Sequence, residues 1–500
     1  MKQLTKISVA FLGFEFAHHV PAVKTAIEKL KYEGIRCEVK IWSARDGIKK
    51  QVESEFNGCK FIDDGLGWLG RFPKCDCRIP DTDEVELSPL EVKHFSYTFS
   101  RTTFFRNPQN INKNQIEKFK TLVRKCMCEI KKENISHIFF SKLPHSLIHL
   151  AFYYASNRLG LPVVYTENPH FGGDYVYPVL QNESNLFQKP TKHDENFYKF
   201  FCDSMFARNL NKNLEPPRYM TADLSYMPSV PESHTPFFRS QIAYKIFKLT
   251  KARLLGDYTG RFFELLQAAF SVIKRLYIYN NYVTSSELNY QERYILILLQ
   301  YHPEQTTSPS ALDTPFEEER ISLLADKYPN FKIFVREHPS NLKTQSGSFF
   351  QYRNLRAVKK MLRAKNVYYL WPSDRLSYKE LIENAFFTMS TNSTVAIESI
   401  LLRTPTVHFS NSFASGFPGV LIAKNVDSIT LPLIDKLQDQ LDKLTDGELV
   451  ERSYQTYSKH DLTQGFINGY HELRYSGEQY ITGASNIIFS SLMKLAEKTP

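Results

Sequence analysis

Three short apolar runs stand out in the second half of the chain, and polar residues follow each of them. They are YILILL at 294–299, FKIFV at 331–335 and FFTM at 386–389, and their aromatic and β-branched residues are typical of buried strands. Helical patterns lie between them, so the order of elements predicts a parallel sheet flanked by helices. In such sheets, ligands bind beyond the carboxyl ends of the strands. We therefore expect the residues that follow the three runs to converge on one binding crevice.

The first part of the chain shows the same alternation of apolar strands and amphipathic helices. The pattern predicts strands at 7–14, 36–42, 137–140 and 163–165, and helices at 21–32, 114–133 and 144–158. The predicted fold class is therefore α/β, with two Rossmann-type domains. A helical pattern extends over 192–282, where aromatic residues at helical spacing favour a packed core. The string GLGWLG at 65–70 has the spacing of a dinucleotide-binding loop, but no helical pattern follows it, so a plain loop is favoured.

Composition and charge narrow the class of protein. The chain has 500 residues, of which 42% are hydrophobic, and this is ample for buried cores. The net charge of +10 favours anionic partners such as nucleotides, phosphorylated lipids, acidic glycans or an anionic membrane surface. No nucleic-acid-binding motif accompanies the basic residues, so we expect no nucleic-acid partner. No apolar run reaches the roughly 18 residues that are needed to span a bilayer.

The seven cysteines favour a reducing compartment. Their number is odd and small for this length, which does not fit a disulfide framework. Cys75 and Cys77 are separated by one residue, as are Cys126 and Cys128, whereas zinc ligands are usually separated by about two to four. No matching histidine cluster follows them. We therefore expect a cytoplasmic protein without a metal site or a cofactor.

The polar residues after the second and third runs suit a phosphate group. His338 and Pro339 follow FKIFV, and the histidine, with Arg336 nearby, can stabilise the charge of a departing phosphate. After FFTM come four hydroxyl side chains ahead of a predicted helix: Ser390, Thr391, Ser393 and Thr394. Hydroxyl and backbone N–H groups at a helix start can bind an anion, although N-capping also explains such residues and His338 can be an ordinary loop histidine. Together the two groups predict a nucleotide leaving group, and Glu398, further along the helix, can orient a hydroxyl or a ribose or remain solvated.

Four carboxylates are candidates for the chemical step. Glu15 lies in the loop after the first strand, and Glu167 and Asp174 follow the strand VVY, where a loop can reach a ligand cleft. Any of these three can act as a general base toward an acceptor hydroxyl. The alternative is that 168–174 is only a surface turn, since it is rich in glycine. Glu304 can contact a donor, or act in a double displacement if the reaction retains configuration.

These residues carry a resemblance to a known family. The order of His338-Pro339, the hydroxyl run, Glu398 and then Thr404-Pro405 before the next strand resembles the nucleotide-binding half of GT-B glycosyltransferases. More narrowly, it resembles the bacterial capsule polysaccharide biosynthesis family, whose members are similar to 3-deoxy-manno-octulosonic acid (Kdo) transferases and to bacterial sialyltransferases that use CMP-activated sugars. The string YHPEQTTSPS at 301–310 resembles the start of that family's second domain. The resemblance covers about 290–410.

The resemblance implies a fold and a division into domains. Two Rossmann-type domains would face each other across a cleft, with an acceptor-binding domain at 1–285, a nucleotide-sugar-binding domain at 286–475 and a final helix at 476–500 that packs back on the first domain. It also implies a grip on the CMP phosphate. The residues at the matching positions are His338, Pro339, Ser390 and Thr391, with Ser393 and Thr394 as neighbours.

The implied activity is the transfer of a sugar, of the Kdo type or another nonulosonic acid, from a CMP donor to a glycan or glycolipid acceptor of a surface or capsular polysaccharide. The implied transferase is metal-independent, and a peripheral association with the cell membrane is compatible with it. Two alternatives stay open. CDP-polyol transferases of wall-polymer synthesis have a similar arrangement of residues, and a protein of this fold can assemble glycans without turnover.

Overall fold

The computed structural model describes fifteen parts of the chain. They are 5–44, 46–63, 85–102, 111–144, 146–167, 175–180, 201, 293–300, 310–338, 355–370, 378–393, 395–410, 414–457, 463–464 and 477–497. The predicted loop at 65–70 lies outside them, as do the predicted helices of 192–282 apart from residue 201. The chain divides into two compact units. Unit 1 comprises Met1–Thr102, Ile111–Tyr198 and Tyr454–Pro500, and unit 2 comprises Thr103–Asn110 and Lys199–Ser453.

Unit 1 is built on a mainly parallel sheet with the strand order β13-β6-β5-β4-β1-β2-β3. Its strands are β1 (Thr5–Leu12), β2 (Ile35–Ala44), β3 (Lys60–Asp63), β4 (His137–Phe140), β5 (Val163–Glu167), β6 (Tyr175–Leu180) and β13 (Thr463–Gln464). Its helices are α1 (His19–Tyr32), α2 (Lys49–Glu55), α4 (Pro89–Thr102), α5 (Lys113–Lys132), α6 (Leu147–Arg158) and α17 (Gly477–Glu497), and a short 3₁₀ turn spans Asp46–Ile48. Among the described strands of this sheet, β6 runs antiparallel to both of its neighbours, β5 and β13, and the other neighbouring pairs are parallel.

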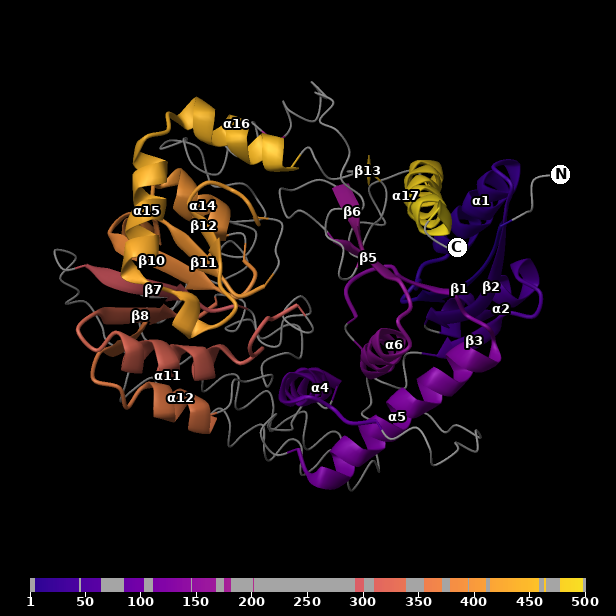
Figure 1. Cartoon of the computed structure of the whole chain (residues 1–500), viewed down its shortest axis with the longest axis horizontal. Helices are drawn as coiled ribbons and strands as arrows, with labels where there is room; N and C mark the ends of the chain where they lie inside the picture. Colours follow the sequence, from indigo (N-terminus) through magenta and orange to yellow (C-terminus); the bar gives the residue numbers. More distant parts are fainter. Residues whose placement is uncertain are drawn as a thin grey trace, which may run out of the picture. The chain divides into compact units, whose positions relative to one another are not determined.

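Both faces of this sheet are covered, which explains why β1 reads as a continuous apolar run. Successive side chains of a strand point to opposite faces. Phe11 packs with α1 and with Ile488 of α17 on one face, whereas Leu12 packs with α5 and α6 on the other. The helix α17 lies beside α1 (Figure 1), and Lys29 Nζ donates to Asn486 Oδ1 at 2.8 Å. The core of unit 1 therefore contains residues from both ends of the described chain.

Unit 2 contains an all-parallel sheet with the strand order β12-β11-β10-β7-β8-β9. Its strands are β7 (Tyr294–Leu298), β8 (Lys332–Arg336), β9 (Val367–Leu370), β10 (Ala385–Ser390), β11 (Thr406–His408) and β12 (Val420–Ile422). Its helical elements are α11 (Glu317–Lys327), α12 (Leu355–Met361), α13 (Tyr378–Glu383), α14 (Val395–Leu401), a 3₁₀ turn (Val426–Ser428) and α15 (Leu431–Asp442). The helix α16 (Asp446–Tyr457) follows α15.

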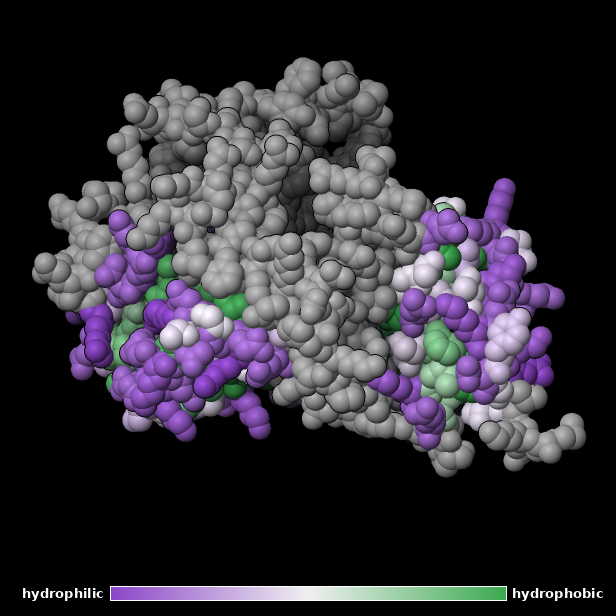
Figure 2. Space-filling model, turned by 90° about the horizontal axis from the view of Figure 1, so that it is seen from above, coloured by the Kyte–Doolittle hydropathy of each residue, from purple (hydrophilic) through white to green (hydrophobic). Residues whose placement is uncertain are grey.

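Alternate side chains of β7 belong to two hydrophobic cores, one on each face of the sheet. Ile295 and Ile297 pack against Leu324 of α11 on one face, and Leu296 packs against Leu381 of α13 on the other. The helices turn their apolar faces to the sheets. The described part of the surface that Figure 2 shows is therefore largely hydrophilic. The α/β class predicted from the sequence is confirmed, since each unit is a mainly parallel sheet flanked by helices.

Candidate functional site

The strand order of unit 2 defines a place for a ligand. The chain passes from β7 to β8 and β9 on one side, and then returns to β10, β11 and β12 on the other side. In α/β sheets, the crevice at such a reversal, outside the carboxyl ends of the strands, is where ligands bind. His338 follows β8 and Ser390 ends β10, so both lie at this edge and flank β7. Two strand spacings of about 4.8 Å separate their strands.

The position of His338 is fixed by its neighbours. Its backbone N–H donates to Glu337 Oε1 at 2.9 Å, and the hydroxyl of Tyr369 on β9 donates to the other oxygen of this buried carboxylate. The backbone N–H of Glu337 donates to the Leu370 carbonyl at 3.1 Å. The His338 side chain is half-buried, as is that of Arg336 at the end of β8. A half-buried imidazole on such a support can meet a ligand without a large loss of conformational entropy.

The two hydroxyl residues at the end of β10 differ in their contacts. Ser390 is 2% exposed, and its Oγ has no hydrogen-bond partner among the described residues. The Thr391 hydroxyl accepts from Arg320 Nη1 at 2.8 Å and donates to Glu317 Oε1 at 3.3 Å. The structure thus places the Thr391 side chain in an interior network, while the hydroxyl of Ser390 is available for a further hydrogen bond.

The loop that follows is held by short-range contacts. The Gln300 side-chain amide, just after β7, donates to the Asn392 carbonyl. Ser393 Oγ accepts from the Val395 N–H at 3.3 Å, a local bond of the turn type that Ser and Thr side chains form ahead of a helix. Glu398 is buried within α14, as are all the side chains of that helix. The strand ends of β7 and β10 are therefore tied together at the reversal.

Glu317 and Arg320 were missed by the sequence reasoning. They lie on α11 at positions i and i+3 of a stripe that continues with Ile321 and Leu324, and all four side chains are buried. The available signal was a pair of charged residues at positions that the helical period assigns to the core. Charged residues are rarely buried unless they are paired, so such positions predict an internal ion pair or a functional network.

Unit 1 has an equivalent reversal between β1 and β4. The chain passes from β1 to β2 and β3, and later places β4 on the other side of β1. Glu15 follows β1 and Lys142 follows β4, and Lys142 Nζ lies 3.5 Å from Glu15 Oε1 with side-chain exposures of 18% and 10%. The two turns are closely packed at Gly13, where φ is 74° and a Cβ would lie 3.1 Å from Ser141 Oγ and from His149 Cε1. Glycine is required there on both grounds.

Two histidines follow Glu15. Burial lowers the pKa of both His18 and His19, and that of His19 falls well below its ordinary value. The ring of His18 stacks on that of Phe16, with centroids 5.6 Å apart. The Phe16 N–H donates to His19 Nδ1 at 3.4 Å. Because burial disfavours the charged form of an imidazole, we expect both rings to be neutral near pH 7.

The other predicted residues lie elsewhere. Glu167 ends β5 and lies at the same edge of the unit 1 sheet, but β4 separates it from β1, and it pairs with Tyr177 of β6. Four predicted residues lie outside the described residues: Asp174, Glu304, Pro339 and Thr394. The structure therefore brings Ser390, Thr391 and Ser393 together on one loop of unit 2, with His338 at the same sheet edge, and places Glu15 in unit 1.

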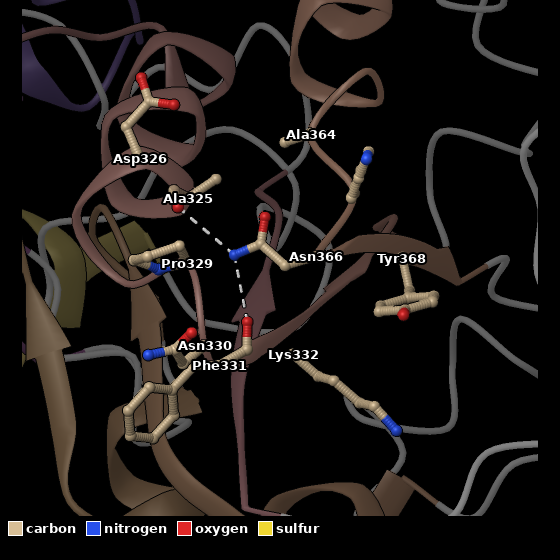
Figure 3. A pocket seen from close by; sticks show the side chains of 10 residues that line it. Ala325, Asp326, Pro329, Asn330, Phe331, Lys332, Ala364, Asn366 and Tyr368 are labelled. Carbon is tan, nitrogen blue, oxygen red and sulfur yellow. Dashed lines mark hydrogen bonds between the residues drawn. The ribbon is translucent and has the colours of Figure 1, made fainter.

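A pocket of about 590 Å³ lies at the opposite edge of the unit 2 sheet, where β8 and β9 begin. Lys332, Lys365 and Tyr368 line it, and Asn366 Nδ2 donates to the Phe331 carbonyl at 3.1 Å (Figure 3). This pocket is separate from the reversal at β7 and β10.

The described residues contain no group of three or more His, Cys, Asp or Glu side chains that could hold a metal ion. Among them there is also no helix with the length and apolar character needed to cross a membrane.

The chain is thus an α/β protein with a candidate ligand site at the carboxyl edge of each sheet.

No protein-family model and no curated protein sequence matches this chain. Among solved structures, it is similar to KpsC of Thermosulfurimonas dismutans, a β-Kdo 2,7 transferase, with 10% sequence identity over 75% of this chain and 90% of that one and a TM-score of 0.27. It is also similar to UDP-GlcNAc 2-epimerase of Neisseria meningitidis bound to UDP-GlcNAc, with 12% identity over 98% of this chain and 100% of that one and a TM-score of 0.22. A glycosyltransferase of Rickettsia africae matches with 9% identity over 99% of this chain and 100% of that one and a TM-score of 0.21. The α/β assignment rests on the strand order and the helices of the chain's own two units.

Proposed function

We propose that the protein is a glycosyltransferase that takes a Kdo-type or other nonulosonic acid from a CMP donor and transfers it to a glycan or glycolipid of a surface polysaccharide. The observation that carries the proposal is the reversal of strand order at β7 and β10, where His338 and Ser390 lie at one sheet edge. A parallel sheet binds nucleotides at such an edge. The choice of CMP follows the sequence resemblance over about 290–410.

In this proposal, unit 2 binds the donor and stabilises the leaving group. Arg336 and His338 offset the negative charge that develops on the departing phosphate, and the Ser390 hydroxyl donates to one of its oxygens. Preorganised donors are effective because they need little reorganisation when the charge develops. The supporting observations are the buried carboxylate that fixes the His338 backbone and the unused hydrogen-bonding capacity of the buried Ser390 Oγ.

Unit 1 supplies the general base, and we assign this role to Glu15. Of the two described candidates, only Glu15 lies at the reversal of its sheet, and Lys142 is within ion-pair distance of it. Glu167 stays the alternative. A base in this position takes the proton from the acceptor hydroxyl as that oxygen attacks the anomeric carbon, and the nucleotide leaves with the electron pair of the broken bond. In this proposal, the reaction takes place in the cytoplasm.

The first test is nucleotide-dependent thermal stabilisation. We expect CMP to raise the melting temperature of the wild-type protein more than UMP or ADP does, and His338→Ala to lose this preference. Lys365→Ala is the control, because Lys365 lines the pocket at the opposite edge of the same sheet. If the stabilisation is lost in Lys365→Ala and kept in His338→Ala, the nucleotide binds in that pocket and not at the reversal. An equal response to all nucleotides would contradict the choice of donor, and preference for CDP would favour a CDP-polyol.

A further inference from the structure

Arg320 of unit 2 is fully buried, with 0% exposure, and each of its three guanidinium nitrogens donates at least one hydrogen bond. Its Nε and Nη2 donate to the two carboxylate oxygens of Asp313, at 3.2 and 2.7 Å, in the bidentate geometry that suits a guanidinium. Nη2 also donates to the Thr314 carbonyl. The guanidinium carbon lies 4.0 Å from the centre of the Phe409 ring. Its remaining donor group, Nη1, is directed to Thr391 at 2.8 Å.

A second buried charge lies beside this pair. Asp313 already neutralises Arg320, yet Glu317 is also buried. Glu317 accepts from the Gln300 backbone N–H, at 3.2 Å to Oε2, and from the Thr391 hydroxyl. Burying charges of this kind contributes little net stability, because their desolvation costs about as much as their attraction returns. What such a network provides is a defined geometry for the groups that it binds.

The residue that this network holds in position is Thr391. Its hydroxyl is held by Arg320 and Glu317, and its carbonyl accepts from Ser410 Oγ at 2.9 Å and from the Phe409 N–H at 3.3 Å. Contacts from α11 and from the residues that follow β11 therefore meet at Thr391, directly after β10. Thr391 directly follows Ser390, whose buried hydroxyl has no partner among the described residues. An unsatisfied buried hydroxyl costs free energy, which a ligand oxygen at this position would recover.

We propose that Arg320 and Glu317 are positioning residues for the nucleotide site of unit 2, and that they act through Thr391 to hold the Ser390 hydroxyl where a phosphate oxygen of the nucleotide binds. This inference rests on the proposed function. It adds two residues that touch no ligand themselves. It also gives Thr391 an indirect role, in which its hydroxyl orients the loop and does not contact the phosphate.

The test compares two buried threonines of the same unit. Thr391→Val removes the hydroxyl from the network, and Thr404→Val removes a hydroxyl that donates to the Ile382 carbonyl at 2.8 Å on the amino side of β11. Thr404 is 2% exposed, so both changes leave a buried group without its hydrogen bond. We expect both variants to lose melting temperature, Thr391→Val more than Thr404→Val, because the groups that it leaves without this bond belong to the charged Arg320 and Glu317. Only Thr391→Val should weaken CMP binding, by about 10-fold or more, and lower kcat/KM by roughly 10- to 100-fold.

Two further variants test whether CMP binding needs the Thr391 hydroxyl and the planar guanidinium of Arg320. Thr391→Ser keeps the hydroxyl and should restore CMP affinity to within about 3-fold of wild type, which a role in packing alone would not predict. Arg320→Lys keeps the charge opposite Asp313 but cannot reproduce the planar fork that also reaches Thr391. It should weaken CMP binding as Thr391→Val does, and it serves as the test if Thr391→Val does not fold.

Calorimetric titration of CMP into each variant separates the possible failures. If the wild-type protein binds CMP and Thr391→Val binds it equally well with unchanged kcat/KM, the positioning role is wrong and the proposed function stands. If Thr404→Val weakens binding as much as Thr391→Val, the effect is general destabilisation and the inference is also wrong. If the wild-type protein binds no nucleotide at all, both the proposed function and this inference are overturned.

Discussion

Glu15 and Lys142 show what single residues can and cannot reveal before the fold is known. The sequence places Glu15 after a strand and makes it one of three candidates for the base, because any polar residue at a strand's carboxyl end can face a ligand. Lys142 likewise follows a predicted strand, 137–140, but nothing in the local pattern pairs it with Glu15. Its proximity to Glu15 depends on β4 lying beside β1, and this strand order is not encoded in the local pattern. The ion pair could therefore be found only from the structure.

Substitution of Glu15 tests its role against that of Glu167. We expect Glu15→Gln to lower kcat by about 10²- to 10⁴-fold, which is the usual contribution of a general base, while CMP still stabilises the protein. Glu167→Gln is the matched control, with the same change of charge at the same sheet edge, and should keep most of the activity. The readout is steady-state turnover of a CMP-sugar with an acceptor glycan. The reverse ranking of the two variants would transfer the role of base to Glu167.

His408 provides a prediction about pH. Burial lowers the pKa of His408 to about 4, whereas the unfolded chain binds this proton near pH 6.5. As the pH falls below about 6.5, the unfolded state is protonated first, so stability is lost between pH 6.5 and pH 4. One such histidine removes about 2 kcal/mol between pH 8 and pH 5. Chemical unfolding at a series of pH values should show this slope, and His408→Gln should reduce it. An unchanged slope in His408→Gln would contradict the assignment.

At the scale of elements, the sequence predicts the long and strongly patterned segments well. The strands of both sheet centres and the helices α1, α5 and α6 lie close to their predicted ranges, with α1 beginning at His19 where Pro21 was expected. Several short edge strands were not predicted, among them Lys60–Asp63, Val367–Leu370 and Val420–Ile422, because three or four residues carry too little periodicity. Strand order, which creates both candidate sites, also lies beyond a local pattern.

The start of α5 tests the local contribution to an element. Asn112 Oδ1 accepts from the Gln115 N–H at 2.9 Å, and Gln115 Oε1 accepts from the Asn112 N–H at 3.0 Å, which is a capping box. We expect Asn112→Ala to lower the free energy of unfolding by about 1 kcal/mol. Thr430→Ala is the control, since Thr430 precedes α15 without a side-chain capping bond. Equal losses in the two variants, measured by urea unfolding, would show that the capping box adds nothing.

At the scale of the whole molecule, the two units have separate cores, and unit 1 takes α17 from far along the chain. Its residue Ile488 is fully buried against the same face of the sheet as Phe11, whereas the Asn486 side chain forms an exposed hydrogen bond with Lys29. The integrity of unit 1 therefore depends on a segment that follows unit 2 in the sequence.

This dependence can be measured by hydrogen exchange. Ile488→Ala should lower the stability of unit 1 by roughly 2–5 kcal/mol, through lost burial and the cavity left behind, and should speed amide exchange in β1. Exchange in β7 of unit 2 should not change. Asn486→Ala, two residues away, should have little effect on either strand, because exposed polar contacts contribute less than about 1 kcal/mol. Faster exchange in β7 of Ile488→Ala would show that the two cores unfold together.

The pairing of α1 with α17 has a consequence for biosynthesis. As the chain leaves the ribosome, the strands and helices of unit 2 are complete before α17 has been translated, so unit 2 can reach its native state while an apolar face of unit 1 is still uncovered. A prematurely terminated product would keep that face exposed, and it would be a natural target for chaperones and proteases.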